Sequence, residues 1–480
     1  MYLGIDIGTS GVKVVATDDS GSVGAQQTAQ LAVFRPQPLW SEQNPDDWWT
    51  AVDTAVRAID PTVRAGVQGI GLAGQMHGAT LLGADDRPLR PAILWNDGRS
   101  FAECAELESA EPRSRGITGN LAMPGFTAPK LLWVRRHEPD LFAQVRSVLL
   151  PKDYVRLRMT GDKASDAADS AGTLWLDVSA RAWSDAMLAA TGLTHSAMPC
   201  LFEGTEFTGK LRREVANSWG MARVPVVAGG GDNAAGAAGV GVIDDGDALL
   251  SLGTSGVIFV ATRNFRPNPE RAVHAFCHCL PGMWHQMAVH LSSAACLDWA
   301  AVQLGLESPG ALLDLAGGVE PGAGPELFLP FLSGERTPHN DPLLRAAWLG
   351  LGNDTDPAGL ASAVLEGVAF AHADGLAALR EAGTRVDELA VIGGGARSPN
   401  WGAILAAALG VRLVYLEGGD VGPALGAAKL AQIAVTGAPP HDVCKRPPVT
   451  RAIEPDAGLG DRFAPKLATY RAAVAALRTV

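Results

Sequence analysis

Two copies of one short sequence have the residue types of a phosphate-binding turn. The copies are Gly8-Thr9-Ser10-Gly11 and Gly253-Thr254-Ser255-Gly256. In each, the glycines allow backbone N–H groups to point at an anion without any cationic side chain. One such turn alone is more often an ordinary hairpin. Because the copies stand 245 residues apart in a chain of 480, we interpret them as equivalent loops of a duplicated domain that face one shared ligand.

Two aspartates lie next to glycine-rich stretches. Asp6 precedes the first turn, whereas Ser251 stands at the equivalent place before the second. The pair therefore supplies one carboxylate, as a single Mg²⁺ on a nucleotide requires. Asp232 follows an apolar strand and three glycines, and with Asn233 it opens a helix of small residues. It can simply cap that helix, or it can stay ionised at the helix N-terminus and accept the proton of a substrate hydroxyl during phosphoryl transfer.

A polar cluster and an aromatic side chain follow two further strands. Met76 and His77 come just after the apolar stretch 68–73, at the end of a strand where open α/β sheets bind ligands. A histidine at such a place is more commonly a core or loop residue. Trp95, followed by Asn96 and Asp97, is either a core residue or the apolar wall of a sugar site.

Two other patterns are open to more than one interpretation. The turn that contains Gly394 and Gly395 has the glycine spacing of a dinucleotide loop, but Ser398 replaces the third glycine. Adenosine binding by close backbone approach therefore fits better than dinucleotide binding. Candidate metal ligands are His274, Cys277, His278 and Cys279. That stretch also has the pattern of a buried strand and lacks a second matched cysteine pair, so we favour the strand.

The composition disfavours several classes of function. The chain is 47% hydrophobic and 19% charged, and its formal net charge of −12 disfavours nucleic-acid binding. Its six scattered cysteines show no disulfide pattern. The start of the chain has no leader-like segment, and no apolar run approaches the ~20 residues that span a bilayer. We therefore expect a cytoplasmic protein with no membrane partner.

The elements that must position these residues follow a recognisable order. A glycine hairpin at 2–16, a strand at 22–34, a helix from Asn44 and a strand at 68–73 make a ribonuclease-H-like series. A second hairpin at 247–262 opens the other half. These patterns predict an α/β fold built of two ribonuclease-H-like domains.

The predicted domains are residues 1–242 and 243–480, with the active site in the cleft between them. The stretch 437–460 is rich in proline and charge, which is typical of a linker. Apolar residues at helical spacing from Phe463 to Leu477 predict a closing amphipathic helix.

With these motifs in view, the chain resembles carbohydrate kinases of the FGGY family over nearly its whole length. The sequences that carry the likeness are GIDIGTSGVKV, GQMHGATLL, RPAILWNDGR, GGGDNAAGA, LSLGTSGV, SGERTPHN, GGGARS and DVGPALGAA. Among these kinases, GQMHGA and ILWNDGR are typical of members that act on xylulose. The resemblance implies the actin-like ATPase fold, with ATP and sugar in the cleft, and ATP-dependent phosphorylation of D-xylulose at O5 to give D-xylulose 5-phosphate.

The resemblance also implies a role for each candidate residue. Asp232 is the expected base at O5, and Asp6 is expected to serve Mg²⁺ directly or through water. The expected sugar ligands are Met76, His77, Asn233 and Trp95. The expected nucleotide ligands are Gly8, Thr9, Ser10, Gly11, Gly253, Thr254 and Ser255 at the phosphates, and Gly394 and Gly395 at the adenosine. The role of Lys13 stays open.

Three alternatives stand beside this interpretation. The first is a kinase of the same fold that acts on another pentulose, a hexulose or a polyol. The second is an actin-like ATPase that switches conformation or forms filaments without any sugar. The third is a nicotinamide-dependent dehydrogenase, which Ser398 already weakens. The expected partners are a small sugar, ATP and Mg²⁺, together with a second copy of the chain in a homodimer.

Overall fold

The opening hairpin belongs to a sheet whose strand order is the predicted one. Strands β1 (Tyr2–Ile7), β2 (Gly11–Thr17) and β3 (Val23–Gln30) form an antiparallel meander. β5 (Gly69–Gly74) pairs parallel with β1, and β14 (Pro225–Val227) pairs parallel with β5. The resulting order β3-β2-β1-β5-β14 confirms the ribonuclease-H-like prediction. Two further strands of this sheet are β13 (Phe207–Lys210) and β15 (Gly230–Gly231).

The second sheet repeats this order. Strands β16 (Ala248–Leu252), β17 (Gly256–Thr262) and β19 (Trp284–His290) are antiparallel, and β22 (Glu388–Ile392) and β23 (Arg412–Leu416) extend the sheet in parallel. The outer strands are β18 (His274–Cys277) and β24 (Val449–Ile453). The two glycine turns thus occupy equivalent places, each between the first and second strand of its sheet, as the duplication hypothesis predicts.

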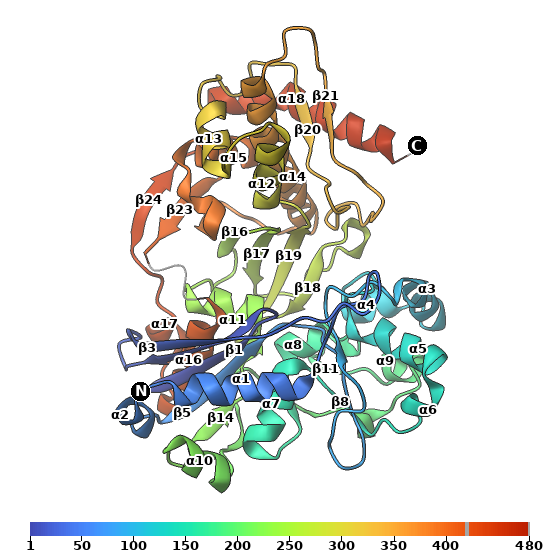
Figure 1. The fold of residues 1–480 in the computed structure, drawn as a ribbon, viewed down its shortest axis with the longest axis vertical. Coiled ribbons are helices and arrows are strands. Elements are labelled where there is room, and N and C mark those ends of the chain that lie inside the picture. Colours follow the sequence, from blue (N-terminus) through green and yellow to red (C-terminus); the bar gives the residue numbers. More distant parts are fainter. Residues whose placement is uncertain (418–421, 479–480) are drawn as a thin grey trace.

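The computed structural model describes residues 1–417 and 422–478. Figure 1 shows two α/β halves stacked along the long axis, with the first sheet below and the second above. The first two residues of the DVGPALGAA sequence lie outside the described residues.

Helices cover the two sheets. Those of the first half are α1 (Pro45–Arg57), α2 (Pro61–Ala65), α3 (Phe101–Ala110), α4 (Ser114–Thr118), α5 (Thr127–His137), α6 (Pro139–Phe142), α7 (Pro151–Thr160), α8 (Ala167–Ala171), α9 (Asp185–Ala190), α10 (Arg213–Trp219) and α11 (Asp232–Gly239). Those that follow are α12 (Ala294–Gln303), α13 (Pro309–Ala316), α14 (Pro357–Glu381), α15 (Pro399–Leu409), α16 (Pro423–Thr436), α17 (Pro440–Val443) and α18 (Ala457–Leu477).

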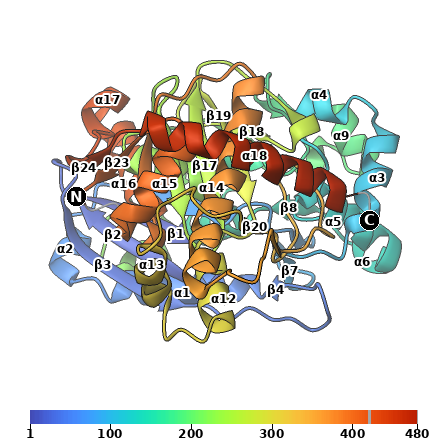
Figure 2. The same ribbon diagram turned by 90° about the horizontal axis from the view of Figure 1, so that it is seen from above.

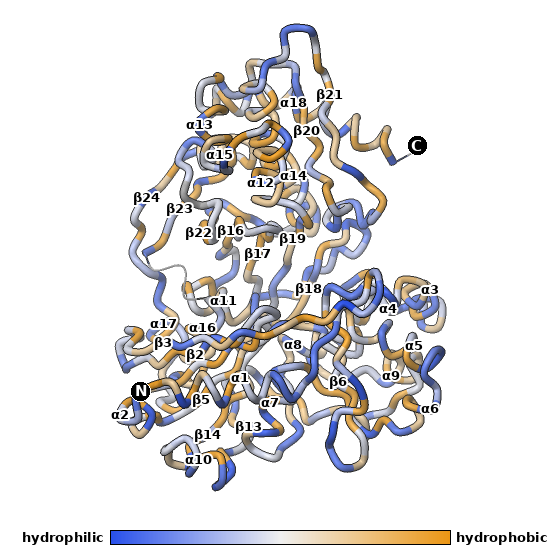
Figure 3. Tube along the Cα trace, in the orientation of Figure 1, coloured by the Kyte–Doolittle hydropathy of each residue, from blue (hydrophilic) through white to orange (hydrophobic). Residues whose placement is uncertain are grey.

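Short strand pairs complete the connections. These pairs are β4 (Glu42–Gln43) with β7 (Ala92–Ile93), β6 (Thr80–Leu82) with β8 (Ser147–Leu149), β9 (Ala164–Asp166) with β12 (Cys200–Phe202), β10 (Leu176–Asp177) with β11 (Ala182–Trp183), and β20 (Leu327–Leu329) with β21 (Ala347–Leu349). Figure 3 shows apolar residues along the central strands of both halves and polar residues on the outer loops.

Helix α1 shows how sequence sets one face of the first sheet. The side chain of Asn44 caps the helix by accepting a hydrogen bond from Asp46 N–H, and proline occupies the first turn, where its missing N–H costs nothing. Trp48 and Val52 then fall on one side and are fully buried. They belong to the same core cluster as the apolar residues of β1 and β2, so α1 covers that face of the sheet.

The other face is covered by α16, which lies far along the chain. In Figure 1 this red helix lies beside the blue strands of the first sheet. A Cβ on Gly71 would overlap the carbonyl oxygen of Ala427, and a Cβ on Gly426 would overlap that of Ala235 in α11. Backbone therefore packs on backbone at both contacts. The chain of the second half thus returns to hold the first sheet, while the domain division near residue 242 stays a prediction.

The last stretch of the chain departs from the sequence-based expectation in one place. The interpretation of 437–460 as a linker is wrong, because it contains α17 and the edge strand β24, which pairs antiparallel with β23. The two prolines that precede Val449 concealed a five-residue strand. The predicted closing helix is confirmed as α18, which packs on the second half, and Figure 2 shows it running across the top.

Among the described residues, α14 is the one helix that is long and apolar enough to cross a membrane. Of its 18-residue apolar stretch, however, 89% is buried inside the protein.

We predict that Gly71→Ala lowers the free energy of unfolding by about 2 kcal/mol or more, because the new methyl group must push α16 away from β5. Gly116→Ala is the matched control, since a Cβ at this exposed helical position meets no atom within 4 Å. Urea unfolding of the three proteins measures the effect. Equal unfolding midpoints for Gly71→Ala and the wild type would show that α16 does not depend on this contact.

Candidate active site

A network of amide side chains fixes the first glycine turn. Gly8 N–H donates to the carbonyl oxygen of Gly11 at 3.0 Å, which closes the turn. The Thr9 hydroxyl donates to Gln75 Oε1 at 2.9 Å, and Gln43 Nε2 donates to the Thr9 carbonyl oxygen at 2.7 Å. Gln75 Nε2 in turn donates to Gln43 Oε1 at 2.9 Å. The polar groups of Thr9 thus point inward to these amides, whereas Ser10 is exposed at the tip of the turn.

The second turn is supported by the start of α12. Gly253 N–H donates to the Ser255 carbonyl oxygen at 3.1 Å, and the carbonyl oxygens of Gly253 and Thr254 accept from Ala294 N–H and Ser293 N–H, each at 2.9 Å. The side chains of Thr254 and Ser255 are exposed. Both turns therefore have fixed backbones and open tips, the arrangement that a phosphate ligand needs.

Asp6 and Asp232 come close together through strand register. Asp6 pairs with Ala73 of β5, and Ala73 pairs on its other side with Gly230, two residues before Asp232. Burial and, next, the charge of Asp232 raise the pKa of Asp6 to about 7, which the charge of Lys13 partly opposes. Burial raises the pKa of Asp232 to about 6. The two carboxyl groups thus share one electrostatic environment.

Asn233 holds one oxygen of Asp232. Both its backbone N–H, at 2.7 Å, and its Nδ2, at 2.8 Å, donate to Asp232 Oδ1. Asp232 is the first residue of α11, and its N-cap is Gly231, so the simple N-cap interpretation of Asp232 is wrong. No hydrogen bond to its second oxygen, Oδ2, is found among the described residues. A direct role of Asn233 toward the sugar stays a prediction, whereas its role in orienting the carboxylate is visible.

His77 is a neutral acceptor. Burial, with a smaller contribution from the charge of Lys130, lowers its pKa to about 3. Its Nδ1 lies 2.6 Å from the carbonyl oxygen of Gly172. Because a carbonyl only accepts, Nδ1 carries the proton and Nε2 is the acceptor. Its backbone has a left-handed φ of 68°, held by Lys130 Nζ and the Thr127 hydroxyl, which donate to the His77 carbonyl oxygen at 2.9 and 3.1 Å.

Met76 links His77 to Asp232. A Cβ on Gly231 would lie 2.8 Å from Met76 Cγ, and a Cβ on Gly172 would lie 3.0 Å from Met76 Cε. The glycine before Asp232 thus makes room for this side chain. Met76 and His77 therefore form one continuous surface next to Asp232, which we call the sugar wall.

Trp95 lines a cavity of about 530 Å³ that residues from both halves enclose. Its ring is 38% exposed, and its Nε1 donates to the Thr9 hydroxyl at 3.0 Å. Asp97, in contrast, is buried in an ion pair with Arg99 at 2.7 Å and contributes to the scaffold. The opposite side of the cavity comes from Glu335 and Arg336, which motif spacing alone did not identify as site residues.

The two glycines predicted at the adenosine differ in their surroundings. A Cβ on Gly394 would meet no atom within 4 Å, whereas a Cβ on Gly395 would lie 2.7 Å from the Trp401 ring. Gly394 is therefore open to a ligand, and Gly395 is needed to pack on Trp401. The preceding Gly393, with φ of 92°, approaches the backbone of Leu252 beside the second turn.

No group of three or more His, Cys, Asp or Glu side chains that could hold a metal exists in the part of the chain that is described. His274 and Cys277 lie in the buried strand β18, so the strand interpretation of that stretch is confirmed.

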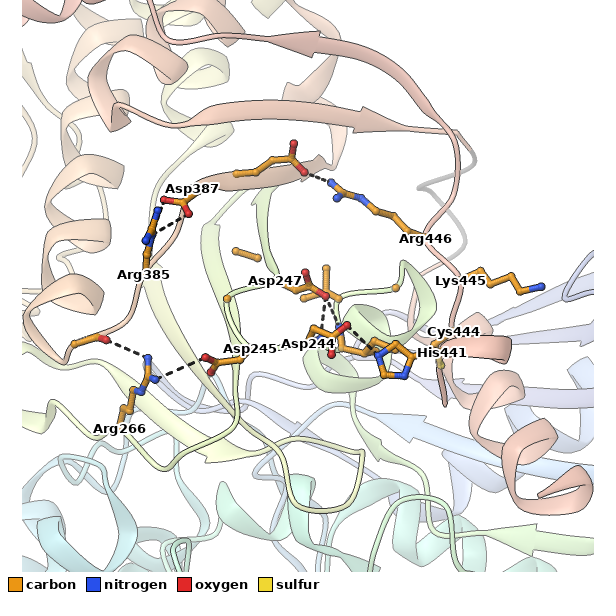
Figure 4. A pocket seen from close by; sticks show the side chains of 17 residues that line it. Asp244, Asp245, Asp247, Arg266, Arg385, Asp387, His441, Cys444, Lys445 and Arg446 are labelled. Atoms are coloured by element: carbon orange, nitrogen blue, oxygen red, sulfur yellow. Dashed lines mark hydrogen bonds and ion pairs between the residues drawn. The ribbon is translucent and has the colours of Figure 1, made fainter. Parts of the chain in front are cut away.

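A separate cavity of about 740 Å³ lies at the connection between the halves (Figure 4). Asp244, Asp245 and Asp247 from the connecting segment contribute to its lining. Asp244 pairs with His441 at 3.0 Å, and Asp245 with Arg266 at 3.8 Å. None of the predicted site residues lines it, so this cavity marks the connection and not the chemistry.

We predict that Asp6→Asn stabilises the ligand-free protein more at pH 8 than at pH 4. The folded state raises the pKa of Asp6 above its ordinary value to about 7. The stability this group contributes is therefore present below about pH 4 and lost as the pH rises through about 7. The asparagine variant avoids that loss, so its unfolding temperature should exceed that of the wild type by about 2 °C or more at pH 8.

Exposed Asp354→Asn is the control for the change of charge. An increase in unfolding temperature that is the same at pH 4 and pH 8 would contradict the raised pKa of Asp6.

Comparison with known proteins agrees with this geometry. Models of the FGGY family of carbohydrate kinases match residues 1–239 with the N-terminal domain and 248–435 with the C-terminal domain. The chain is 55% identical to "Xylulose kinase" of Escherichia coli K12 over 98% of each chain. It is 37% identical to that of Bacillus subtilis over 89% of this chain and 87% of the relative.

Solved structures share the fold. The crystal structure of a "xyloylose kinase" from Brucella ovis has a TM-score of 0.97 at 50% identity, covering 100% of this chain and 99% of that one. A xylulose kinase from Rhodospirillum rubrum has a TM-score of 0.92 at 26% identity, covering 100% and 99%. The chain therefore has the two-domain actin-like ATPase fold and belongs to the FGGY family of carbohydrate kinases.

Proposed function

We propose that this protein transfers the γ-phosphoryl group of ATP to O5 of D-xylulose, giving D-xylulose 5-phosphate. The observation that carries the proposal is the Asp232 carboxylate, with one oxygen fixed by Asn233 and the other left for a ligand. The relative from Escherichia coli that is 55% identical carries the name of this activity.

Asp232 is the base in this proposal. Its pKa of about 6 leaves the carboxylate ionised at neutral pH while keeping its basicity above that of an ordinary aspartate. Because phosphoryl transfer passes through a loose transition state, the carboxylate mainly orients O5 and takes its proton late. The fixed Oδ1 contributes by limiting the orientations of the group.

The sugar lies along the wall formed by Met76, His77 and Trp95. His77 Nε2 accepts a hydrogen bond from a sugar hydroxyl, since the Nδ1 proton already binds Gly172. The Trp95 ring provides an apolar surface, and its Nε1 remains engaged with Thr9. The hydrogen bond from Trp95 to Thr9 thus connects the sugar wall to the first phosphate turn.

The phosphates lie between the two turns, with Gly8–Gly11 on one side and Gly253–Ser255 on the other. The open face of Gly394 accommodates the adenosine, with Gly395 supporting it from below. Backbone N–H groups at both turns stabilise negative charge at fixed positions. Closing the cleft excludes water and so limits the hydrolysis of ATP.

Asp6 is the residue that fits Mg²⁺. Its Oδ1 is buried without a hydrogen-bond partner among the described residues, and its pKa is raised to about 7. A divalent cation nearby, directly or through water, would satisfy this oxygen and restore the ionised form. When bound, Mg²⁺ neutralises charge on the nucleotide phosphates.

A cytoplasmic location and a homodimer belong to this proposal as well. All six cysteines are free thiols, four of them buried, which fits a reducing compartment. The homodimer rests on the family resemblance, and the mass of the protein in solution tests it.

We predict that Asp232→Asn lowers kcat for sugar phosphorylation by about 10²- to 10⁴-fold, because the amide cannot accept the O5 proton. In the wild type, kcat/KM should rise with pH through an apparent pKa of about 6, as Asp232 deprotonates. Coupled ADP release measures both, and fluorescence titration checks that the variant still binds ATP. Near-normal turnover in Asp232→Asn would remove this residue from the role of base.

We predict that ADP release from Mg-ATP rises mainly with D-xylulose when D-xylulose, L-xylulose, D-ribulose, L-ribulose and glycerol are compared. Stronger stimulation by another sugar would support a sugar kinase but would reject D-xylulose as its preferred substrate. Equal ATP turnover with and without sugar would favour the actin-like ATPase, and light scattering would then test for filaments.

A further inference from the structure

Arg336 is a cationic side chain that the second half contributes to the cavity beside Trp95. It follows β20 and lines the same cavity as Trp95 and Asn96. A Cβ on Gly125 would lie 4.0 Å from Arg336 Nη2, so the guanidinium lies beside this glycine. The charge of Arg336 also contributes to the lowered pKa of His77. The arginine therefore lies within the electrostatic reach of the predicted sugar wall.

No carboxylate neutralises this guanidinium within ion-pair distance among residues 1–417 and 422–478. The neighbouring Glu335 is already engaged, because its Oε1 accepts from Leu291 N–H at 2.9 Å and from the backbone N–H of Arg336 at 2.8 Å. Its Oε2 lies 3.4 Å from His290 Nδ1. Burial lowers the pKa of Arg336. Arg336 is half-buried, so guanidinium donors that face the cavity can be satisfied by an acceptor on a ligand.

The guanidinium is positioned by a chain of hydrogen bonds that joins the two halves. Arg336 Nη1 lies 3.4 Å from His274 Nε2, which must be the acceptor because arginine only donates. His274 Nδ1 then carries the proton and donates to Asn120 Oδ1 at 3.3 Å. Asn120 also bonds the backbone of Ala275 in β18, accepting from its N–H at 3.2 Å and donating to its carbonyl oxygen at 2.9 Å. An edge strand of the second half is thereby tied to the first half beside the cavity.

The contacts give Arg336 a place relative to the base. Gly231, next to Asp232, packs on Met76, and His77 follows Met76 in the chain. The His77 ring lies 4.8 Å from the Phe126 ring. Phe126 follows Gly125, over which Arg336 lies. These contacts run from the base through Met76 and His77 to Phe126 and the arginine, and the charge of Arg336 acts on His77. The proposed ligand lies along them, with its reacting oxygen at Asp232 and its other end toward Arg336.

We infer that Arg336 binds the keto end of the sugar, at the C2 carbonyl oxygen and the O1 hydroxyl, and thereby selects ketoses. This inference rests on the proposed function. A guanidinium presents only donors, in a planar fork that matches two neighbouring oxygens. A carbonyl oxygen only accepts, which makes it the complementary group. Arg336 is thus a specificity residue supplied by the half of the chain that binds the nucleotide.

The test compares Arg336→Met and Arg336→Lys with the wild type on D-xylulose and on 1-deoxy-D-xylulose, which lacks O1. On D-xylulose, Arg336→Met should raise KM by about 10- to 100-fold, the range expected for lost charged hydrogen bonds, with a smaller effect on kcat. Arg336→Lys should recover part of the loss. On 1-deoxy-D-xylulose the loss should be at least about fivefold smaller, because one of the two contacts is already missing.

Arg345→Met is the matched control, since this exposed arginine follows on the same loop and, among the described residues, hydrogen-bonds only the carbonyl oxygens of Pro342 and Leu344. Its KM should stay unchanged. Equal losses for Arg336→Met on both sugars, or a loss confined to kcat, would overturn the inference while leaving the proposed function intact. A wild type inactive on both ketoses would instead reject the proposed function and this inference with it.

Discussion

The contact that organises this molecule is the close approach of α16 to the first sheet and to α11. Side chains are absent at Gly71 and Gly426, so helix backbone lies directly on strand and on helix. This contact fixes α11, and the first residue of α11 is Asp232. The same helix belongs to the chain that has already built the second sheet. The position of the proposed base therefore depends on both halves being folded, which links the formation of the cleft to the fold as a whole.

Close packing also explains where flexibility is excluded. Asp6 lies in a central strand, between neighbours on both sides, and Asp232 follows a strand paired with β5. The backbones that carry the two carboxylates cannot move apart without breaking main-chain hydrogen bonds. Their pKa values, about 7 and about 6, report a cost of placing charge there. Such a cost is typical of sites that bind a cation or a proton, where stability is given up for function.

Sequence patterns predicted the features that depend on local chain chemistry. The glycine turns, the capped start of α1 at Asn44 and the order of strands follow from residues close together in the chain. Two other features depend on remote contacts. β24 was concealed by prolines and gains its place only by pairing with β23. Gly395 resembles its neighbour Gly394 in sequence, and only the distant Trp401 shows that its role is packing.

Arg336 is the clearest case of information that the sequence does not hold locally. The SGERTPHN motif contains both Glu335 and Arg336, but their place in the sequence does not show which groups their side chains contact. The structure separates them, because Glu335 turns to the backbone of Leu291 and leaves the guanidinium to His274. Only the three-dimensional arrangement shows that this cation faces a cavity that begins at Trp95.

The hydrogen-bonding capacities of the site form a pattern that matches a ketose better than a polyol. Asp232 and the Nε2 atom of His77 are acceptors, and they suit hydroxyl groups that donate. Arg336 provides only donors, and in the proposed binding mode it faces a carbonyl oxygen, which only accepts, beside one hydroxyl oxygen that accepts. A ketose offers hydroxyls along most of its chain and one carbonyl near its end. A polyol fits the acceptors equally well but must turn a hydroxyl proton away from the guanidinium. In the proposed binding mode, acceptors come from the first half and a donor from the second. The keto group is then the part of the substrate at which sugar binding depends on the approach of the two halves.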